Sequence, residues 1–365
     1  MKKHKICVYS ICKNEAKFVD RFMDCLEEIK DHVYVLDTGS TDDTVKKFKA
    51  RGAHIKSKKY DKFEFHKARN DALKLVPEEY DICICLDIDD CIDSGFVEKI
   101  QSRWQDDTTQ MRFYHYCNLD SRDEPLIKFL CGKIHKRDCY KWIYPIHEVL
   151  KYQGDNEKFI DAPDIIVRHR PDVEKSREFY LDLLEEYVDR YPEDTRNVHL
   201  LTREYKSRHQ WQNCIRMAHK YLRIENATYV PEIGQILASL ANAYCNMGYY
   251  EEAEMWGIKT LETIGDCRTP YVELMVIYYK QKMYEQVIVY GLKALKIEKR
   301  NEHLTEDIWC WDGTIYDYLS LSYYYLEDYD NAIKYIDLDI KQNPDIKRLK
   351  DNRKLFVAKK KNRNY

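Results

Sequence analysis

The chain has 365 residues, which is enough for two domains of ordinary size. Its 60 basic and 63 acidic residues give a net charge of −3, and this balance argues against a nucleic-acid or membrane-surface partner. A hydrophobic content of 44% excludes general disorder, and no stretch approaches the roughly 18 consecutive apolar residues of a membrane span.

The first half of the chain alternates strand-like and helix-like segments. Apolar, β-branched runs predict strands at residues 6–11, 32–36, 53–56 and 81–86. Apolar spacings of three and four predict helices at residues 15–29, 41–49 and 65–75. This alternation predicts a Rossmann-like, mostly parallel α/β sheet covered on both faces, with ligands bound outside the carboxyl ends of its strands.

The chain has 13 cysteines, and no pair has the spacing of a zinc site or a redox motif. Cys83 and Cys85 alternate within an apolar run, so we expect them on one face of a strand. Free cysteine packs as a small hydrophobe. We therefore expect the cysteines to be reduced core residues of a cytoplasmic protein.

A polar motif, DTGSTDDT, follows the second predicted strand at residues 37–44. An acid at a strand end, a glycine turn and a helix start together form a pocket suited to a nucleotide. The carboxylate of Asp37 can accept hydrogen bonds from a base or a ribose. The same residues also fit a well-capped connection between a strand and a helix without any ligand.

Two further features carry charge near predicted strand ends. The sequence LDIDD at residues 86–90 places two acids at i and i+2, which can share Mg²⁺ or Mn²⁺ and so neutralise a diphosphate leaving group; a solvated acidic turn is the alternative. Arg69 lies on a predicted helix, where its fixed charge could pair with a carboxylate, face a phosphate or simply lie at the surface.

From near Pro171 helical spacing dominates, and one pattern recurs. An aromatic residue is followed six residues later by a second aromatic and three residues after that by a small or aliphatic residue. The copies are Tyr205/Trp211/Cys214, Tyr244/Tyr250/Ala253, Tyr278/Tyr284/Val287 and Tyr323/Tyr329/Ala332. Their intervals of 39, 34 and 45 residues indicate tetratricopeptide-type repeats of about 34 residues with inserted loops, whose aromatics pack between helices.

The motifs resemble those of family-2 glycosyltransferases. KNE at 13–15, DTGSTDDT at 37–44, ARN at 68–70 and DID at 87–89 occur in the order found in that family. The chain is similar to the branch with a tetratricopeptide array after the catalytic domain, whose relatives include bacterial peptide S-glycosyltransferases. We expect a catalytic domain at 1–172, an all-α repeat domain at 173–345 and a basic tail at 346–365.

The resemblance implies a GT-A fold, a nucleotide-diphosphate sugar as donor, with UDP as the usual carrier, and inversion at the anomeric carbon. Asp37 and Arg69 would seat the nucleotide, and Asp87 would contact the ribose or the metal shell. Asp89 would be the main carboxylate ligand of Mn²⁺ or Mg²⁺. Asp90 stands where the family has a small or apolar residue, so which of these two acids binds the metal is open.

An inverting transferase needs a base to take the proton of the acceptor. Glu148 is the favoured candidate and His147 the second, because the resembling branch has a similar His-Glu pair; a structural pair at a helix start is the alternative. His169, at the end of a strand predicted near 165–170, would complete the metal site. Its imidazole suits Mn²⁺ better than Mg²⁺, and a capped strand end is the alternative.

Three functions are compatible with these features. The leading one is a transferase whose acceptor is a protein, peptide or glycan, with the repeats holding the acceptor or forming a dimer. A second is a non-catalytic repeat adaptor with a vestigial nucleotide-binding domain. A third, a nucleotidyltransferase, is disfavoured because SICKNE at residues 10–15 is not a glycine-rich basic loop.

Overall fold

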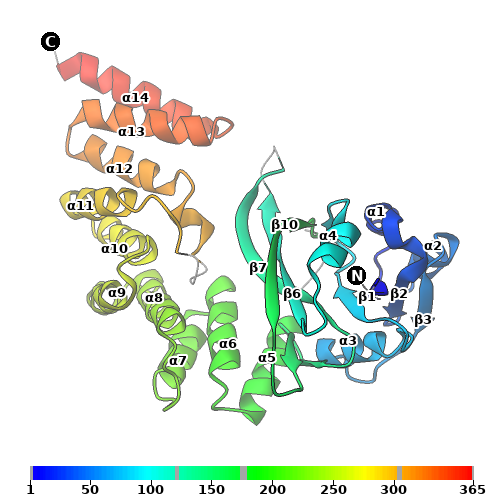
Figure 1. Ribbon diagram of the computed structural model, residues 1–365. Coiled ribbons are helices and arrows are strands. Elements are labelled where there is room, and N and C mark those ends of the chain that lie inside the picture. Colours follow the sequence, from blue (N-terminus) through cyan, green and yellow to red (C-terminus); the bar gives the residue numbers. More distant parts are fainter. Residues whose placement is uncertain (1–2, 120–122, 173–178, 302–305, 364–365) are drawn as a thin grey trace. The chain divides into compact units, whose positions relative to one another are not determined.

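The computed structural model describes residues 3–119, 123–172, 179–301 and 306–363 (Figure 1). The chain divides into two compact units, Met1–Leu183 and Leu184–Tyr365. The expected domain boundary at residue 172 adjoins residues 173–178, which lie outside the described residues. Among the described helices, none is both long and apolar enough to cross a membrane.

An eight-stranded sheet forms the centre of the first unit, in the order β3-β2-β1-β4-β7-β6-β10-β5. Its strands are β1 (Ile6–Cys12), β2 (Val33–Asp37), β3 (His54–Ser57), β4 (Ile82–Cys85), β5 (Asp90–Ile92), β6 (Gln110–Leu119), β7 (Pro125–Lys136) and β10 (Phe159–His169). The four strands from β3 to β4 run parallel, as predicted. Beyond them, β7 is antiparallel to β4 and β6, while β10 is parallel to β6 and antiparallel to β5.

Helices cover both faces of the sheet, because the central strands place apolar side chains on each face. The helices are α1 (Val19–Cys25), the 3₁₀ segment η1 (Glu27–His32), α2 (Thr44–Ala50), α3 (Phe65–Leu73) and α4 (Phe96–Arg103). Val8 packs in the core on the α1 side, whereas Cys7, Cys83 and Cys85 pack on the α3 side. Cys83 and Cys85 therefore share one face, as predicted.

The helix expected at 15–29 is shorter than predicted. The α-helical part ends at Cys25, and the following 3₁₀ segment contains a non-helical residue, Ile29, at φ −138° and ψ 30°. Leu26 and Ile29 are nevertheless buried in the core, which accounts for the helix-like apolar spacing. The apolar pattern thus predicted which side chains are buried but not the backbone conformation that buries them.

A disulfide bond joins Cys25, at the end of α1, to Cys91 in β5, with the two Cα atoms 5.7 Å apart. The expectation that every cysteine is reduced is wrong for this pair, because residues 66 positions apart meet only in the folded chain. The other cysteines of the described chain form no disulfide. Cysteine usage therefore no longer supports the expected cytoplasmic location.

A small antiparallel ribbon lies beside α3. Its strands are β8 (Tyr140–Ile143) and β9 (Val149–Tyr152), and their connection carries His147 and Glu148. The connection turns sharply, with positive φ values of 72° at Tyr144 and 49° at His147. Glu148 therefore lies at the end of a loop between strands and not at the start of a helix.

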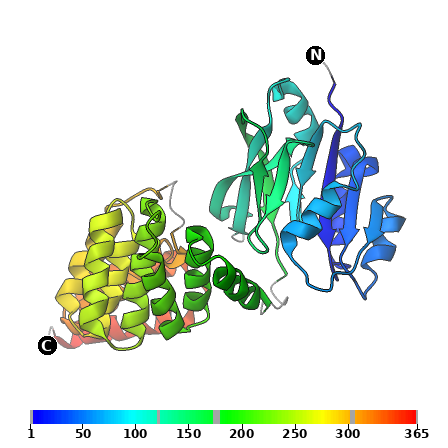
Figure 2. The same cartoon turned by 90° about the horizontal axis from the view of Figure 1, so that it is seen from below.

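The second unit consists of helices packed in antiparallel pairs, which Figure 2 shows from a second direction. Apart from α5 (Phe179–Arg190), which contains the boundary, the helices are α6 (Thr195–Ser207), α7 (Trp211–Tyr221), α8 (Val230–Asn246), α9 (Tyr250–Ile264), α10 (Thr269–Lys280), α11 (Tyr284–Leu295), the 3₁₀ segment η2 (Ile308–Cys310), α12 (Thr314–Tyr325), α13 (Tyr329–Gln342) and α14 (Lys347–Arg363).

The recurring aromatic pattern marks the turn inside each pair. Its second aromatic is the first residue of α7, α9, α11 or α13. Its third member, such as Ala253, is fully buried in every copy. The residue two before each of these helices has a positive φ, as in Lys282 at 61° and Gly248 at 85°, which ends the preceding helix in the left-handed conformation. The predicted all-α repeat architecture is confirmed.

Candidate active site

The strand ends of β1 and β2 carry the first site residue. Asp37 is the last residue of β2, its side chain is buried, and its Oδ1 accepts a hydrogen bond of 2.9 Å from the Ser40 amide. The Thr38 amide and hydroxyl both donate to the carbonyl oxygen of Cys12 at the end of β1. Asp37 therefore fixes the turn that opens at this edge of the sheet, where a parallel sheet binds its ligands.

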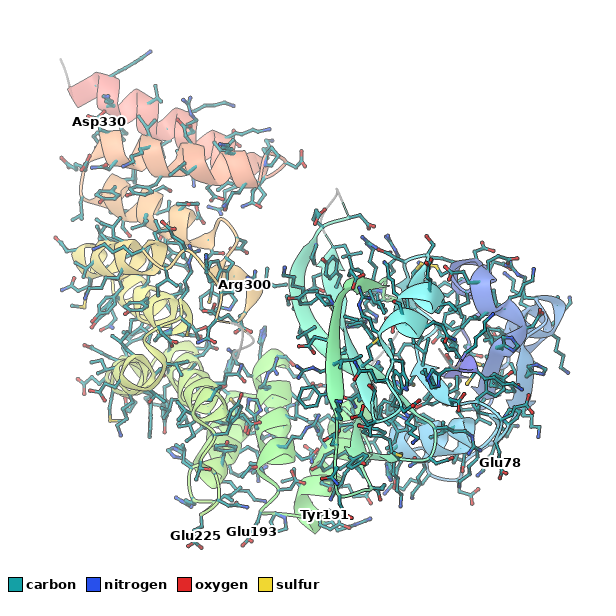
Figure 3. The ribbon with its side chains drawn as sticks, viewed as in Figure 1. Glu78, Tyr191, Glu193, Glu225, Arg300 and Asp330 are labelled. Carbon is teal, nitrogen blue, oxygen red and sulfur yellow. A yellow bond between two sulfur atoms is a disulfide. The ribbon has the colours of Figure 1, made fainter. Side chains whose placement is uncertain are left out.

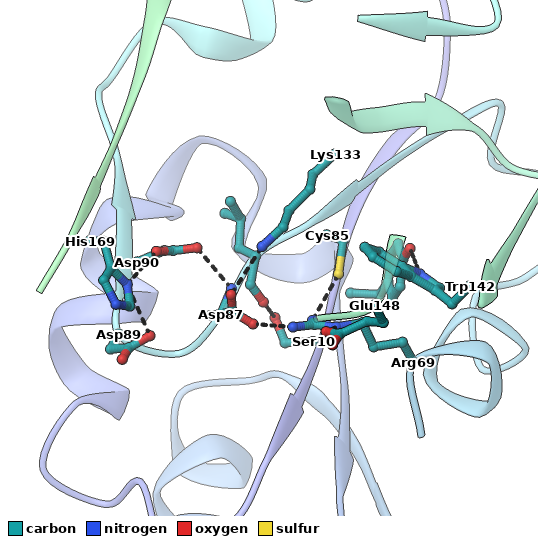
Figure 4. Close-up of polar contacts among 12 residues, drawn as sticks. Ser10, Arg69, Cys85, Asp87, Asp89, Asp90, Lys133, Trp142, Glu148 and His169 are labelled. Carbon is teal, nitrogen blue, oxygen red and sulfur yellow. Dashed lines mark hydrogen bonds and ion pairs between the residues drawn. The ribbon is translucent and has the colours of Figure 1, made fainter. Parts of the chain in front are cut away.

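Arg69 projects from α3 and links two carboxylates (Figure 4). Its Nη2 donates to Asp87 Oδ1 at 2.5 Å, its Nη1 to Cys85 Sγ at 3.2 Å, and its Nε to Glu148 Oε1. Burial lowers the pKa of this guanidinium, but Asp87 and the other negative groups raise the pKa well above its ordinary value. Asp87 and Glu148, both partly buried, therefore form one ionic network with the buried Arg69.

Lys133, near the end of β7, completes the charge balance of this network. Its Nζ lies 3.0 Å from Asp87 Oδ2. Burial would raise the pKa of Asp87, but the two cations Arg69 and Lys133 lower it well below its ordinary value. The charges of Arg69 and Lys133 thus balance those of Asp87 and Glu148. Such pairing offsets the free energy that ionised groups lose when they leave water.

A layer of aromatic side chains supports Arg69. The guanidinium lies over the ring of Trp142 at 5.1 Å, close enough for a cation–π contact. Trp142 Nε1 donates to the Tyr9 hydroxyl at 2.7 Å, and this hydroxyl is 2.8 Å from His135 Nε2. Asn70 exchanges hydrogen bonds of 2.8 and 3.0 Å with the backbone of Trp142. Arg69 is therefore positioned by the ring of Trp142 as well as by its two acids.

A second cluster combines acids with imidazoles. Asp90 is buried, and its Oδ1 is 3.1 Å from both His115 Nε2 and His169 Nδ1. The ligand atoms of these three residues lie within 4.8 Å of one another, which suits one metal ion. Asp89 Oδ1 lies 3.5 Å from the same His169 nitrogen. The predicted pair Asp89 and His169 is therefore close, and Asp90 and His115 join it.

The three neighbouring acids have different electrostatic surroundings. Burial raises the pKa of Asp89, and the nearby charges of Asp87 and Asp90 add to this rise while His169 opposes it. Burial would also raise the pKa of Asp90, but hydrogen bonds from His115 and His169 lower it to about 2. Burial lowers the pKa of His169, yet its acidic neighbours raise it above the ordinary value. This crowding of negative charge favours a bound cation.

The backbone around Asp89 is braced from two sides. Arg21 of α1 donates through Nη2 to the carbonyl oxygens of Asp89 and Arg170, each at 3.3 Å. The Arg170 amide donates to the Asp89 carbonyl at 2.9 Å. The disulfide between Cys25 and Cys91 ties the same helix to the strand that follows. The loop carrying the acids is therefore fixed to α1 and to the end of β10.

Sequence reasoning missed two residues of these clusters, His115 and Lys133. Both come from the long β6–β7 hairpin, which the sequence did not reveal as a unit. The signal for His115 was present, because Met111, Phe113 and His115 occupy alternate, buried positions of β6. A histidine in the apolar register of a strand needs a polar partner. His147, the second base candidate, precedes Glu148 in the β8–β9 loop, and its ring lies 6.3 Å from that of Tyr180.

A sheet whose β3-β2-β1-β4 strands run parallel, with charged side chains gathered near the strand ends, is typical of α/β domains that bind ligands at that edge. Residues 7–175 match the model of the family described as Glycosyl transferase family 2. The first unit is thus a family-2 glycosyltransferase domain, as its motifs predicted. In the sequence, this domain precedes the helical repeats. No match is found among curated proteins.

Several solved structures with similarity to this chain are helical repeat proteins. They include TTC0263, a thermophilic TPR protein of Thermus thermophilus, at 15% identity and a TM-score of 0.37, covering 49% of this chain and 89% of that one. A tetratricopeptide repeat protein from Parabacteroides merdae has 11% identity and a TM-score of 0.37, with coverages of 48% and 63%. YrrB, a TPR protein with an unusual peptide-binding site, has 12% identity and a TM-score of 0.37, with coverages of 50% and 83%.

Proposed function

We propose that the chain is an inverting glycosyltransferase that moves a sugar from a nucleotide diphosphate, with uridine as the base, to a protein, peptide or glycan. The observation that carries the proposal is the pair of clusters at the strand ends of a family-2 domain. One cluster is the ionic network of Arg69, Asp87 and Glu148. The other is the group of Asp90, His115 and His169, with Asp89 beside it.

The donor nucleotide is proposed to lie along the ends of β1, β2 and β4. Asp37 and Asp87 are acceptors, and the hydroxyls of a ribose and the N–H group of uracil are donors that match them. Arg69 and Lys133 keep Asp87 ionised, so that it can accept without taking up a proton. A carboxylate held by two cations in this way is already oriented, which lowers the cost of binding.

The cation site is supported by the chemistry of its donor atoms. A carboxylate and two imidazoles within 4.8 Å fit Mn²⁺ better than Mg²⁺, which prefers oxygen alone. The bound ion would supply charge neutralisation for the diphosphate leaving group. Asp89, partly exposed beside His169, is proposed to complete the ligand set on the side that faces the donor.

Glu148 is proposed as the base that takes the acceptor proton, and its contact with Arg69 offers a direct test. Gln at position 148 keeps an oxygen that can accept from Arg69 Nε but cannot take up a proton. If Glu148 is the base, Glu148→Gln lowers kcat by roughly 10²- to 10⁴-fold while the dissociation constant of the donor stays nearly unchanged. A near-normal kcat would make Glu148 a partner of Arg69 and move the base to His147.

Calorimetric titration with nucleotide-diphosphate sugars, with and without Mn²⁺, tests the proposed function. We expect one donor to bind, and to bind much more weakly without the metal. Arg69→Met is expected to weaken donor binding, because it removes a cation that holds Asp87. Arg103→Met, which removes an exposed ion pair with Asp164, is the matched control and is expected to leave donor binding unchanged. Absence of binding across uridine, guanosine, cytidine and thymidine donors would leave the chain as a repeat adaptor with a vestigial nucleotide site.

A further inference from the structure

Part of the insertion between α11 and α12 contacts the helices of the repeats. Residues 306–311 of this insertion, with the sequence EDIWCW, contact α6 and the start of α10. These two helices and α8, which contacts both of them, form what we call the α6–α8–α10 face. Lys206 of α6 and Asp307 are 101 positions apart in sequence, yet Nζ and Oδ2 lie 2.9 Å apart. The segment therefore spans several repeats instead of only its neighbours.

The start of α10 receives an acid from this segment. Glu306 is buried, and its Oε1 accepts from the amides of Arg268 and Thr269 at 2.7 and 3.2 Å. Free amides at a helix start favour a carboxylate. Glu306 Oε2 accepts from Trp311 Nε1 at 2.8 Å. One acid is therefore bound by a helix end and by an aromatic side chain of the same segment.

Two arginines hold the aromatic end of the segment. The Arg268 guanidinium lies 3.8 Å from the ring centre of Trp311, and that of Arg300, labelled in Figure 3, lies 5.3 Å from it. Arg268 also donates to the backbone carbonyls of Ile297 and Cys310, at 2.9 and 3.2 Å. The contacts are hydrogen bonds, ion pairs and cation–π contacts, which are also means by which protein surfaces recognise peptides.

Within the described part of the chain, the segment donates no hydrogen bond to one buried carboxylate oxygen of the α6–α8–α10 face. Glu273 of α10 is buried, and its Oε2 accepts from Asn242 at 3.2 Å. Among the residues that the structure describes, Glu273 Oε1 has no hydrogen bond, and its nearest cation is Lys206 Nζ at 4.0 Å. Asp307 shares that single ammonium, so two acids face one cation. A buried acceptor without a donor destabilises this arrangement, so the contacts of the segment are not the most stable that the face could make.

We propose that the α6–α8–α10 face binds a polypeptide segment that carries a carboxylate five residues before a tryptophan, and that residues 306–311 occupy the face until such a segment displaces them. The carboxylate belongs at the start of α10, and the tryptophan belongs between Arg268 and Arg300. The proposal does not depend on the transferase reaction, because it concerns binding to the repeats alone.

The test uses the full chain and a fluorescein-labelled peptide, EDIWSWD, which copies residues 306–312 with Ser in place of Cys. Glu306→Gln combined with Trp311→Ala is expected to release the resident segment and to strengthen peptide binding at least tenfold over the unaltered protein. Lys206→Met in that background is expected to weaken binding at least fivefold. Equal affinity in the unaltered and released proteins, or no effect of Lys206→Met, would overturn the proposal. A peptide with Gln and Ala in place of its Glu and second Trp is the control.

Hydrogen exchange on the unaltered protein keeps the proposal testable if the released variant does not fold. The amides of Cys310, Trp311 and Asp312 donate within the segment, to Asp307 and Ile308, and are protected while it is in place. Excess peptide is expected to speed their exchange. Unchanged protection at saturating peptide would refute displacement. Exchange that speeds with protein concentration in the absence of peptide would assign the face to a second copy of the chain, and so overturn the proposed partner.

Discussion

Single residues in the site owe their properties to neighbours that the sequence does not reveal. Asp87, Asp89 and Asp90 are almost adjacent in the chain, yet the pKa is lowered in Asp87 and Asp90 and raised in Asp89. The difference follows from which cations or imidazoles each carboxylate contacts. The resemblance to family-2 enzymes implied Asp89 as the main metal ligand, whereas the group of three donor atoms contains Asp90.

Substitution of the two acids separates these assignments. Asp90→Asn is expected to weaken Mn²⁺ binding to the free protein by more than roughly tenfold. Replacing a residue that only hydrogen-bonds to a metal ligand already lowers metal affinity by about that factor. Asp89→Asn is expected to weaken it less, because Asp89 approaches only His169 of the group. Calorimetric titration with Mn²⁺ measures both, and the opposite order would identify Asp89 as the main ligand.

His135 predicts a pH dependence of stability. Burial lowers its pKa to about 4, while in the unfolded chain it has the ordinary value near 6.5. Between these values the unfolded chain binds a proton that the folded chain does not, so stability falls as the pH falls from about 6.5 to 4, by about 3 kcal/mol. Urea unfolding of the first unit, monitored by segment-resolved hydrogen exchange at several pH values, is expected to show this loss.

His135→Gln is the matched test of that loss, because its amide can still bond to Tyr9 and the loss should shrink to a small remainder. The exposed His54, replaced in the same way, is expected to leave the pH dependence unchanged. An unaltered pH dependence in His135→Gln would show that other groups cause it.

At the scale of elements, local pattern predicted the repeats well because each helix pair repeats the same packing problem. Gly257 of α9 and Gly291 of α11 are 34 residues apart, which is the repeat length. A Cβ at Gly257 would lie 2.7 Å from Leu274 Cδ2, and one at Gly291 would lie 2.8 Å from Leu319 Cδ2. Both glycines therefore allow successive helices to approach closely.

Gly257→Ala is expected to destabilise the second unit, contrary to the usual effect in a helix. Alanine favours a helix over glycine by about 1 kcal/mol, but the added methyl forces Leu274 to move, at a cost of roughly 1–3 kcal/mol. Urea denaturation of the second unit measures the balance. Glu262→Ala, exposed on the same helix, is expected to change stability by less than about 0.5 kcal/mol. A more stable Gly257→Ala would show that α9 and α10 have room to separate.

The element that local pattern failed to predict is the β6–β7 hairpin. Its strands pair with β4 and β10, so their burial depends on partners that are distant in sequence. The hairpin contributes His115 to one cluster and Lys133 to the other. These two side chains therefore cannot be assigned to the site until the topology of the sheet is known.

At the scale of the whole molecule, the two units have separate cores, so a ligand of one need not stabilise the other. Mn²⁺ with the bound nucleotide is expected to slow hydrogen exchange in β1, β4 and β10 and to raise the unfolding midpoint of the first unit, by mass action. Exchange in α8 and α9 is expected to stay the same. Equal slowing in both units would show that they unfold as one.

The sequence by itself determined the features that depend on near neighbours in the chain. These are the parallel strands and their polar ends, the positions of Asp37, Arg69 and the acids, and the paired helices of the repeats. Only the tertiary structure decided which side chains meet. Asp90 lies 25 and 79 residues from the two histidines it contacts, and Cys25 lies 66 residues from Cys91. Such contacts arise when strands distant in sequence pair, and local periodicity carries no record of that pairing.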